Sequence, residues 1–327
     1  MKINSIAPAL LLGITALIIG HFFSLKIVED SKAVARIKLE STEPLLMVNR
    51  IMNINEWNPI SKTAQKTAMD EHDRIIAQAN EWQEKIDRHS IIVMWLAFVL
   101  MSITALLYLK SNYFNAAMAM ALAFAALLFL RIGVDAPAME IQVYSEDLNI
   151  SIKLSGKAIY EDLQNDRYLK HIPFLEFFKH KEIGFDHKFH GKIYYQYQSK
   201  SILESIVLLF KANNQVVALA LLLFSVIFPL LKVIFNIWIL LWPRTGQWEG
   251  FSSIVYYLGK WSMADVFVVS MFLAYLSFHN MGQQGVTVDS QVSIGFYFFL
   301  AYVIVSITSG ILTQNWIRQY YKSKQMQ

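Results

Sequence analysis

The sequence "SVIFPLLKVIFNIW" at residues 225–238 places a proline and then a lysine inside the longest apolar run of the chain. The run, residues 216–242, is long enough to cross a bilayer, because a hydrocarbon core of about 30 Å needs about 20 residues of helix. A lysine at that depth needs an ionic partner, a water-filled path or a route to the headgroups, since an unpaired buried ammonium is costly. We therefore interpret the run as a membrane span in which Lys232 has a specific role.

The composition also indicates a membrane protein. Of 327 residues, 55% are hydrophobic and 17% charged, and the mean hydropathy is +0.37, outside the usual balance of a soluble domain. The net charge of +4 comes without a dense basic cluster, so we expect no nucleic-acid partner. The chain has no cysteine, which excludes disulfides, zinc ribbons and thiol nucleophiles.

Six stretches reach or approach the length of a span, so we predict a mainly α-helical polytopic membrane protein with six transmembrane helices. The first stretch offers no small-residue cleavage site, and we interpret it as a retained signal anchor. The six are residues 6–23, 91–109, 114–132, 216–242, 261–278 and 292–312.

Basic residues in the short loops and at the ends predict the orientation. With six spans, these residues fall on one side, which the positive-inside rule assigns to the cytoplasm together with both termini. Residues 26–90 and 134–212 then lie outside; they also carry lysines, but segments this long translocate largely regardless of charge. The side assigned to the cytoplasm carries Lys2, Lys110, Arg244, Lys260 and the tail "RQYYKSK".

The first outer segment, residues 26–90, is predicted to be an extracytoplasmic helical hairpin standing on the first two spans. Apolar residues recur at heptad-like spacing and run straight into the second span. The sequence "NINEWNPISK" at 53–62 has the Asn and Pro signals of a turn. The heptad-like positions are Ile75, Ala79, Trp82 and Ile86.

The second outer segment, residues 134–212, is predicted to contain a small antiparallel β-sheet. "MEIQVY", "LNISIKL" and "IGFDHKFHGKIYYQYQ" alternate in hydrophobicity, and we place a turn at "HG", residues 190–191. "AIYEDLQNDRYLKHIPFLEFF", between these strands, is typical of an amphipathic helix that Pro173 interrupts. We place a boundary near residue 112, between a two-span unit of residues 1–112 and a four-span domain of residues 113–327.

Lys232 has a candidate partner in the next span. With Trp242 at the interface, Lys232 lies about 15 Å inside, and its stem reaches only about 6 Å. Asp265 lies about 6 Å inside if Trp261 marks the same interface, so the two side chains can meet. Three interpretations remain open: a static ion pair, a pair that borders a polar cavity for substrate, headgroup or protons, or a different register with a more hydrated lysine.

Other polar residues are less informative. Pro229 predicts a kink, which is common in membrane helices but also occurs at transport sites. Arg131 ends the third span, where it can snorkel or pair with Asp135. The histidines near 187 and 190 match no metal-binding spacing, so we expect no metal. No P-loop, G-x-S-x-G or H-E-x-x-H sequence occurs, so we expect neither an enzyme nor a cofactor.

Two stretches together carry a family resemblance. "ALALLLFSVIFPLLKVIFNIWILLW" followed by "LGKWSMADVFVVSMFLAY" resembles the paraquat-inducible protein A family, which pairs a "FPLLK"-type span with a "W-x-M-x-D-V-F" span. "RIGVDAPAMEIQV", "SKSILESIVLLFKANN" and "QVSIGFYFFLAYVIVSITSG" are similar to neighbouring family segments, so the resemblance covers about residues 114–316. The motif positions are Pro229, Lys232, Trp261, Met263 and Asp265.

The resemblance implies a protein of the bacterial inner membrane that moves lipids across the cell envelope with periplasmic MCE-domain partners. It also implies that the motif residues form the intramembrane site. Two departures limit the transfer. Several relatives have cysteine-based zinc ribbons, which this chain cannot form, and many have two such domains where this chain has one copy behind a different two-span hairpin.

The alternative function is a sensory or accessory membrane protein whose outer hairpin binds a ligand or partner. The hairpin is too short for a deep pocket, but its apolar heptad face suits a docked partner. A structural scaffold is a third possibility. The sequence contains no nucleotide-binding motif, so transport would draw energy from a partner, an ion gradient or lipid mass action.

Overall fold

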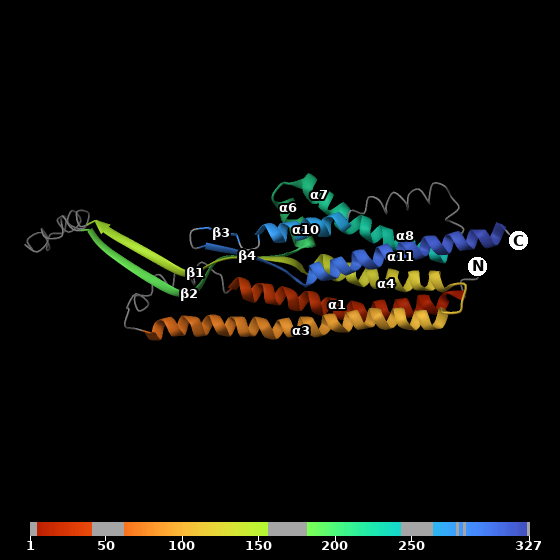
Figure 1. Ribbon diagram of the computed structural model, residues 1–327, viewed down its shortest axis with the longest axis horizontal. Helices are drawn as coiled ribbons and strands as arrows, with labels where there is room; N and C mark the ends of the chain where they lie inside the picture. The colour runs from red at the N-terminus through yellow and green to blue at the C-terminus, as the bar shows by residue number, and fades with distance from the viewer. Residues whose placement is uncertain are drawn as a thin grey trace, which may run out of the picture.

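The computed structural model describes residues 5–40, 62–155, 182–242, 264–278, 281–283 and 286–325. Its described part consists of a bundle of long helices with a β-sheet at one end (Figure 1). We call this end the sheet end. The start of the first helix and the end of the last helix lie together at the opposite end, which we call the termini end.

Two long helices, α1 (Ala7–Glu40) and α3 (Lys62–Tyr108), run side by side along the bundle (Figure 1). At about 1.5 Å per residue, the 47 residues of α3 extend about 70 Å. One continuous helix therefore contains the end of the predicted outer segment and the predicted second span. Ala79 and Ile86 are buried and Trp82 packs against the core. The predicted helical continuity is therefore confirmed, while most of the predicted turn at 53–62 lies outside the described residues.

Helix α4 (Phe114–Asp135) is the central helix of the bundle. Most of its residues are buried, including a run of alanines that lets neighbouring helices approach closely. A Cβ added at Gly20 of α1 would lie 2.5 Å from a Leu128 methyl of α4. A Cβ at Gly133 would lie 2.6 Å from the backbone nitrogen of Phe299 in α11 (Ile294–Gln325).

The sheet is antiparallel with four strands in the order β2-β1-β4-β3. Strands β1 (Pro137–Ser155) and β2 (Glu182–Ser201) form a long two-stranded ribbon that reaches away from the helices (Figure 1). Near the bundle, β4 (Val286–Val292) joins β1, and β3 (Met281–Gln283) joins β4. The small antiparallel sheet was predicted, but its two C-terminal strands were not.

The predicted turn at "HG" is wrong, because β2 continues through it. Asp147 pairs with His190 and Ser145 pairs with Ile193, so Gly191 and its neighbour stand opposite a single residue of β1. This is a β-bulge, a position where glycine is frequent. The amphipathic helix predicted around Pro173 lies outside the described residues.

The fourth predicted span is a helix with a wide turn inside it. It is made of α7 (Gln215–Leu222), a π-helical turn at Leu223–Ile227 and α8 (Phe228–Leu241). Pro229 has no amide hydrogen, so the α-helical hydrogen bond to the carbonyl of Ser225 cannot form. The π-helical turn lies directly before this missing hydrogen bond. The structure thus has a π-helical turn on the N-terminal side of Pro229, and the predicted kink stays a prediction.

Five described helices are long and apolar enough to cross a membrane, so the chain is a multi-pass membrane protein. The fifth predicted span, residues 261–278, corresponds in its described part to α10 (Ala264–Phe278), whose 15 residues extend about 22 Å and fall short of a full bilayer core. The six-span count is thus not confirmed. The division into units of residues 1–112 and 113–327 stays a prediction, and α1 and α3 both pack against α4.

Candidate functional site at the junction of the helices and the sheet

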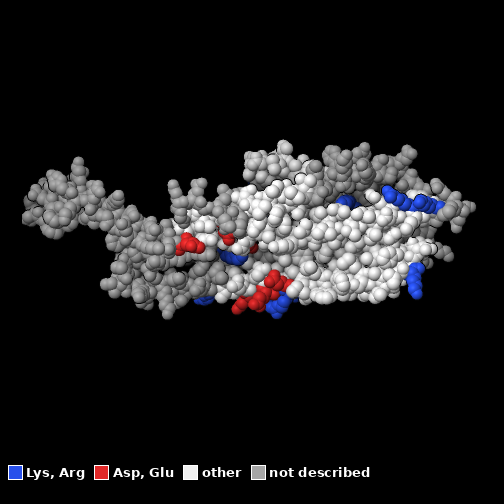
Figure 2. Space-filling view, in the orientation of Figure 1, with Lys and Arg blue, Asp and Glu red and all other residues white. Residues whose placement is uncertain are grey.

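Charged side chains gather where the helices meet the sheet. Figure 2 shows a broad uncharged surface over the helical body, and the acidic residues visible on this face all lie on its sheet side. An apolar band of this kind suits lipid tails, whereas ionic groups are placed at its boundary or in pairs. The acidic residues visible on this face are therefore concentrated at the sheet end, whereas basic residues also lie at the termini end.

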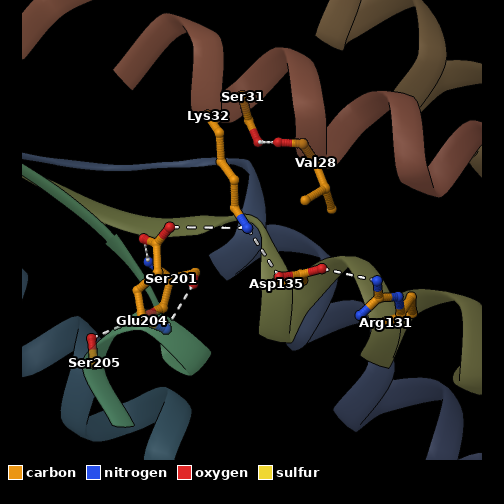
Figure 3. Close-up of polar contacts among 8 residues, drawn as sticks. All are labelled: Val28, Ser31, Lys32, Arg131, Asp135, Ser201, Glu204 and Ser205. Atoms are coloured by element: carbon orange, nitrogen blue, oxygen red, sulfur yellow. Dashed lines mark hydrogen bonds and ion pairs between the residues drawn. The ribbon is translucent and has the colours of Figure 1, made fainter. Parts of the chain in front are cut away.

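One chain of ion pairs joins three helices there (Figure 3). Arg131 Nη2 lies 3.0 Å from Asp135 Oδ2 within α4. The other oxygen of Asp135 lies 3.2 Å from Lys32 Nζ of α1, which also lies 3.9 Å from Glu204 Oε1 of α6 (Ile202–Lys211). Asp135 and Glu204 thus each have at least one cationic partner.

Glu204 also fixes the start of α6. Ser201 Oγ accepts a hydrogen bond from the Glu204 amide at 3.1 Å, and Glu204 Oε2 accepts one from the Ser201 amide at 3.1 Å (Figure 3). Ser205 Oγ donates to the Ser201 carbonyl at 2.8 Å. This capping box satisfies the amides at the beginning of the helix. It therefore holds α6 at a defined angle to β2, whose last residue is Ser201.

A second ion pair lies closer to the sheet. Lys38 Nζ of α1 lies 2.8 Å from Glu140 Oε2 of β1, and Ser293 Oγ donates to Glu140 Oε1 at 3.4 Å. Glu140 is only 7% exposed, so this carboxylate depends on its partners. Burial, and then the charge of Glu140, raises the pKa of the neighbouring Tyr197. The pair fastens the outer part of α1 to the sheet.

Two grooves lie on different faces of α6. The first, which we call the apolar groove, has a volume of about 330 Å³ and lies between β1, β2, α6, α7 and α10. Its apolar lining includes Ile141, Phe267 and Met271, and Lys200 and Ser205 add polar groups. Its volume falls at the low end of the range of about 300–1,000 Å³ that is typical of small-molecule sites.

The second, which we call the charged groove, has a volume of about 320 Å³ and lies against the opposite face of α6. Leucine and valine side chains of α6 form its floor, and five charged residues line it. Lys200 lines both grooves. The charged residues are Lys32, Asp135, Lys200, Glu204 and Lys211.

The predicted intramembrane site is described in part. Pro229 is buried, and its carbonyl accepts a hydrogen bond from the Tyr302 hydroxyl at 3.2 Å. Lys232 is half-buried and takes part in a polar or electrostatic interaction. Asp265 is at the start of α10, and its side chain, like Trp261 and Met263, lies outside the description. The pairing of Lys232 with Asp265 therefore stays a prediction.

One turn beyond Lys232, a hydrogen-bonded chain crosses three helices. Asn236 Nδ2 of α8 donates to Ser309 Oγ of α11 at 2.7 Å, and Ser309 Oγ donates to the Ala119 carbonyl of α4 at 2.8 Å. Such bonds between helices are a stabilising contact in hydrocarbon, where no water competes for the polar groups. The sequence analysis missed this contact, although Asn236 and Lys232 are four residues apart and share a helix face.

Among the residues that the structure describes, no group of three metal-binding side chains occurs. The side chains of His187 and His190 lie outside the description, so the expectation of no metal is not tested there. The pair of Arg131 with Asp135 was an open possibility in the sequence and is present. The contacts of Lys32 and Lys38 join residues more than 100 positions apart, and no local pattern reveals them.

The comparisons with known proteins give one match. A family model described as Paraquat-inducible protein A matches residues 191–320. This region includes both motif stretches of the sequence analysis, α6, and most of α11, whereas the similar stretch at 131–143 lies outside it. No curated protein and no solved structure matches the chain.

Proposed function

We propose that this chain is a component of bacterial cell-envelope lipid trafficking in the inner membrane, because a family model described as Paraquat-inducible protein A matches its residues 191–320. In this proposal the chain crosses the membrane six times and both termini are cytoplasmic. The sheet end then faces the periplasm, where it meets MCE-type partners. The start of the first helix and the end of the last helix both lie at the termini end, which agrees with an even number of spans (Figure 1).

The apolar groove is the observation that best supports a lipid ligand. It lies where the helices meet the sheet, and it is lined mainly by apolar side chains with Lys200, Ser201 and Ser205 among them. A cavity with apolar walls and a few polar groups fits part of an amphiphile, with its chain inside and its headgroup at the polar residues. At about 330 Å³, the groove holds a segment of a lipid and not the whole molecule.

Lys232, Asp265 and Pro229 are the proposed coupling residues inside the membrane, supported by Trp261, Met263 and Arg131. Intramembrane charges commonly mark substrate or proton pathways, and the π-helical turn beside Pro229 is a kind of irregularity that is frequent at functional sites. We expect Lys232→Met and Asp265→Asn each to abolish lipid transfer. A double variant with full transfer would refute the coupling role while leaving a structural ion pair possible.

The experiment for the proposed function fills the apolar groove. Met271 lines it, whereas Leu273 on the same helix is 56% exposed on the apolar surface. The full-length chain, purified gently with Met271→Trp, should retain less phospholipid in native mass spectrometry than the wild type. Leu273→Trp, the matched control, should retain the wild-type amount. A wild-type protein that never holds phospholipid above detergent background would contradict the proposal.

The accessory alternative has its own supporting observation. Lys32 and Lys38 fasten the outer part of α1 to α4, β1 and α6, so a partner bound to the helical hairpin would act on the same junction. This arrangement is compatible with lipid trafficking and supplies a place for a partner. Deletion of the outer hairpin separates the two functions, because transfer that survives the deletion assigns the activity to the four-span region.

A further inference from the structure

We propose that the charged groove binds the headgroup of an anionic phospholipid, with Lys200 holding the phosphate and Lys211 adding positive charge. This inference rests on the proposed function and names the class of lipid. In this arrangement the lipid straddles the start of α6: the headgroup occupies the charged groove, and an acyl chain enters the apolar groove on the other side. Lys200 is placed for this role because it lines both grooves.

The charges of the groove favour an anion. Its three lysines exceed its two carboxylates by one charge, and Arg131 adds another cation at Asp135. Asp135 is held by Arg131 and Lys32, and Glu204 is held by Lys32 and by the amide of Ser201. The negative charges are therefore already compensated.

Lys200 and Lys211 supply the positive charge in excess. Neither forms an ion pair with any residue that the structure describes. They stand at the two ends of α6, whose ten residues extend about 15 Å, and each stem reaches about 6 Å. Both ammonium groups can thus approach one headgroup above the apolar floor of the groove.

The groove also lies at the correct depth for a headgroup. Val207 and Leu208 line it and are about half exposed, and Phe210 beside them is 42% exposed. Val216, the second residue of the next helix, α7, is 84% exposed. Exposed apolar residues of this kind beside lysines are typical of a helix at the boundary between lipid tails and headgroups. Tails and phosphates are both within reach there.

The experiment uses the full-length chain in nanodiscs with equal amounts of phosphatidylglycerol, phosphatidylethanolamine and phosphatidylcholine, followed by native mass spectrometry of the retained lipid. Phosphatidylglycerol should be enriched by about two- to fivefold, the range that one partly exposed ion pair supplies. Lys200→Gln should abolish the enrichment and Lys211→Gln should reduce it. Lys110→Gln, at an exposed lysine outside both grooves, should leave it unchanged.

Two outcomes would overturn the inference. Equal retention of the three lipids, or a preference for phosphatidylethanolamine, would show that the groove does not select a net negative headgroup; lipid trafficking itself would stand. Loss of the enrichment in millimolar inorganic phosphate, with total lipid unchanged, would assign the groove to a free anion. A chain that retains no lipid at all contradicts the proposed function instead, so the two failures are distinct.

Discussion

Removal of Lys38 should destabilise the protein more than removal of its partner Glu140. Lys38→Met leaves a carboxylate that is 7% exposed, whose remaining described neighbours, the Ser293 hydroxyl at 3.4 Å and the Tyr197 phenol, are both uncharged. A buried charge that loses its partner costs about 3–5 kcal/mol. Glu140→Gln leaves a lysine whose side chain is 24% exposed and can turn to water, so its cost should be near 1 kcal/mol.

Thermal unfolding of the purified protein in one detergent measures these differences. For a chain of this size a loss of 3–5 kcal/mol lowers Tm on the order of 5–10 °C. Lys38→Met combined with Glu140→Gln should recover at least half of that loss, because the amide is neutral and still accepts a hydrogen bond from Ser293. Arg36→Met is the control: Arg36 is exposed on the same helix, and no ion pair joins it to a described residue. A double variant no more stable than Lys38→Met would refute the reasoning.

Two further predictions concern packing and pH. Gly133→Ala should prevent stable folding because its Cβ meets the backbone of α11, whereas Gly310→Ala, where nothing lies within 4 Å, should be neutral or stabilise by up to about 1 kcal/mol; expression and Tm of both variants test this. Burial raises the pKa of Tyr197, so above about pH 10 only the unfolded tyrosine loses its proton and stability falls by up to about 1.4 kcal/mol per pH unit. Tyr197→Phe should make Tm less dependent on pH between about 10 and 12, and an unchanged dependence would contradict the assignment.

Apolar periodicity was sufficient to predict the long helices. Of the heptad-like positions, Ala79 and Ile86 are buried and Ile75 and Trp82 are half-buried, as their spacing indicated, because helix packing follows local sequence. The bulge in β2 was mistaken for a turn, although the apolar positions keep the same parity from Ile183 to Tyr197 through the glycine. Unbroken parity favours one continuous strand over a hairpin.

The junction could be predicted only in part. Arg131 and Asp135 are four residues apart on one helix, a spacing that itself predicts an ion pair. Lys32 reaches Asp135 across 103 positions, and such a contact depends on how the helices assemble. Strand β4 was missed because its alternating "VTVDSQV" directly precedes an apolar helix, and the longer apolar signal dominated the interpretation.

Lys32 and Glu204 provide a test in which electrostatics and structural damage predict different results. Both are partly exposed, at 33% and 42% for the side chains, so either substitution should change stability by no more than about 1 kcal/mol. Lys32→Met removes a positive charge from the charged groove and should lower the enrichment of phosphatidylglycerol. Glu204→Gln removes a negative charge, keeps a side chain able to complete the capping box, and should raise the enrichment. Structural damage at the junction would lower lipid retention in both variants, and a change in the same direction would therefore refute the electrostatic role of the groove.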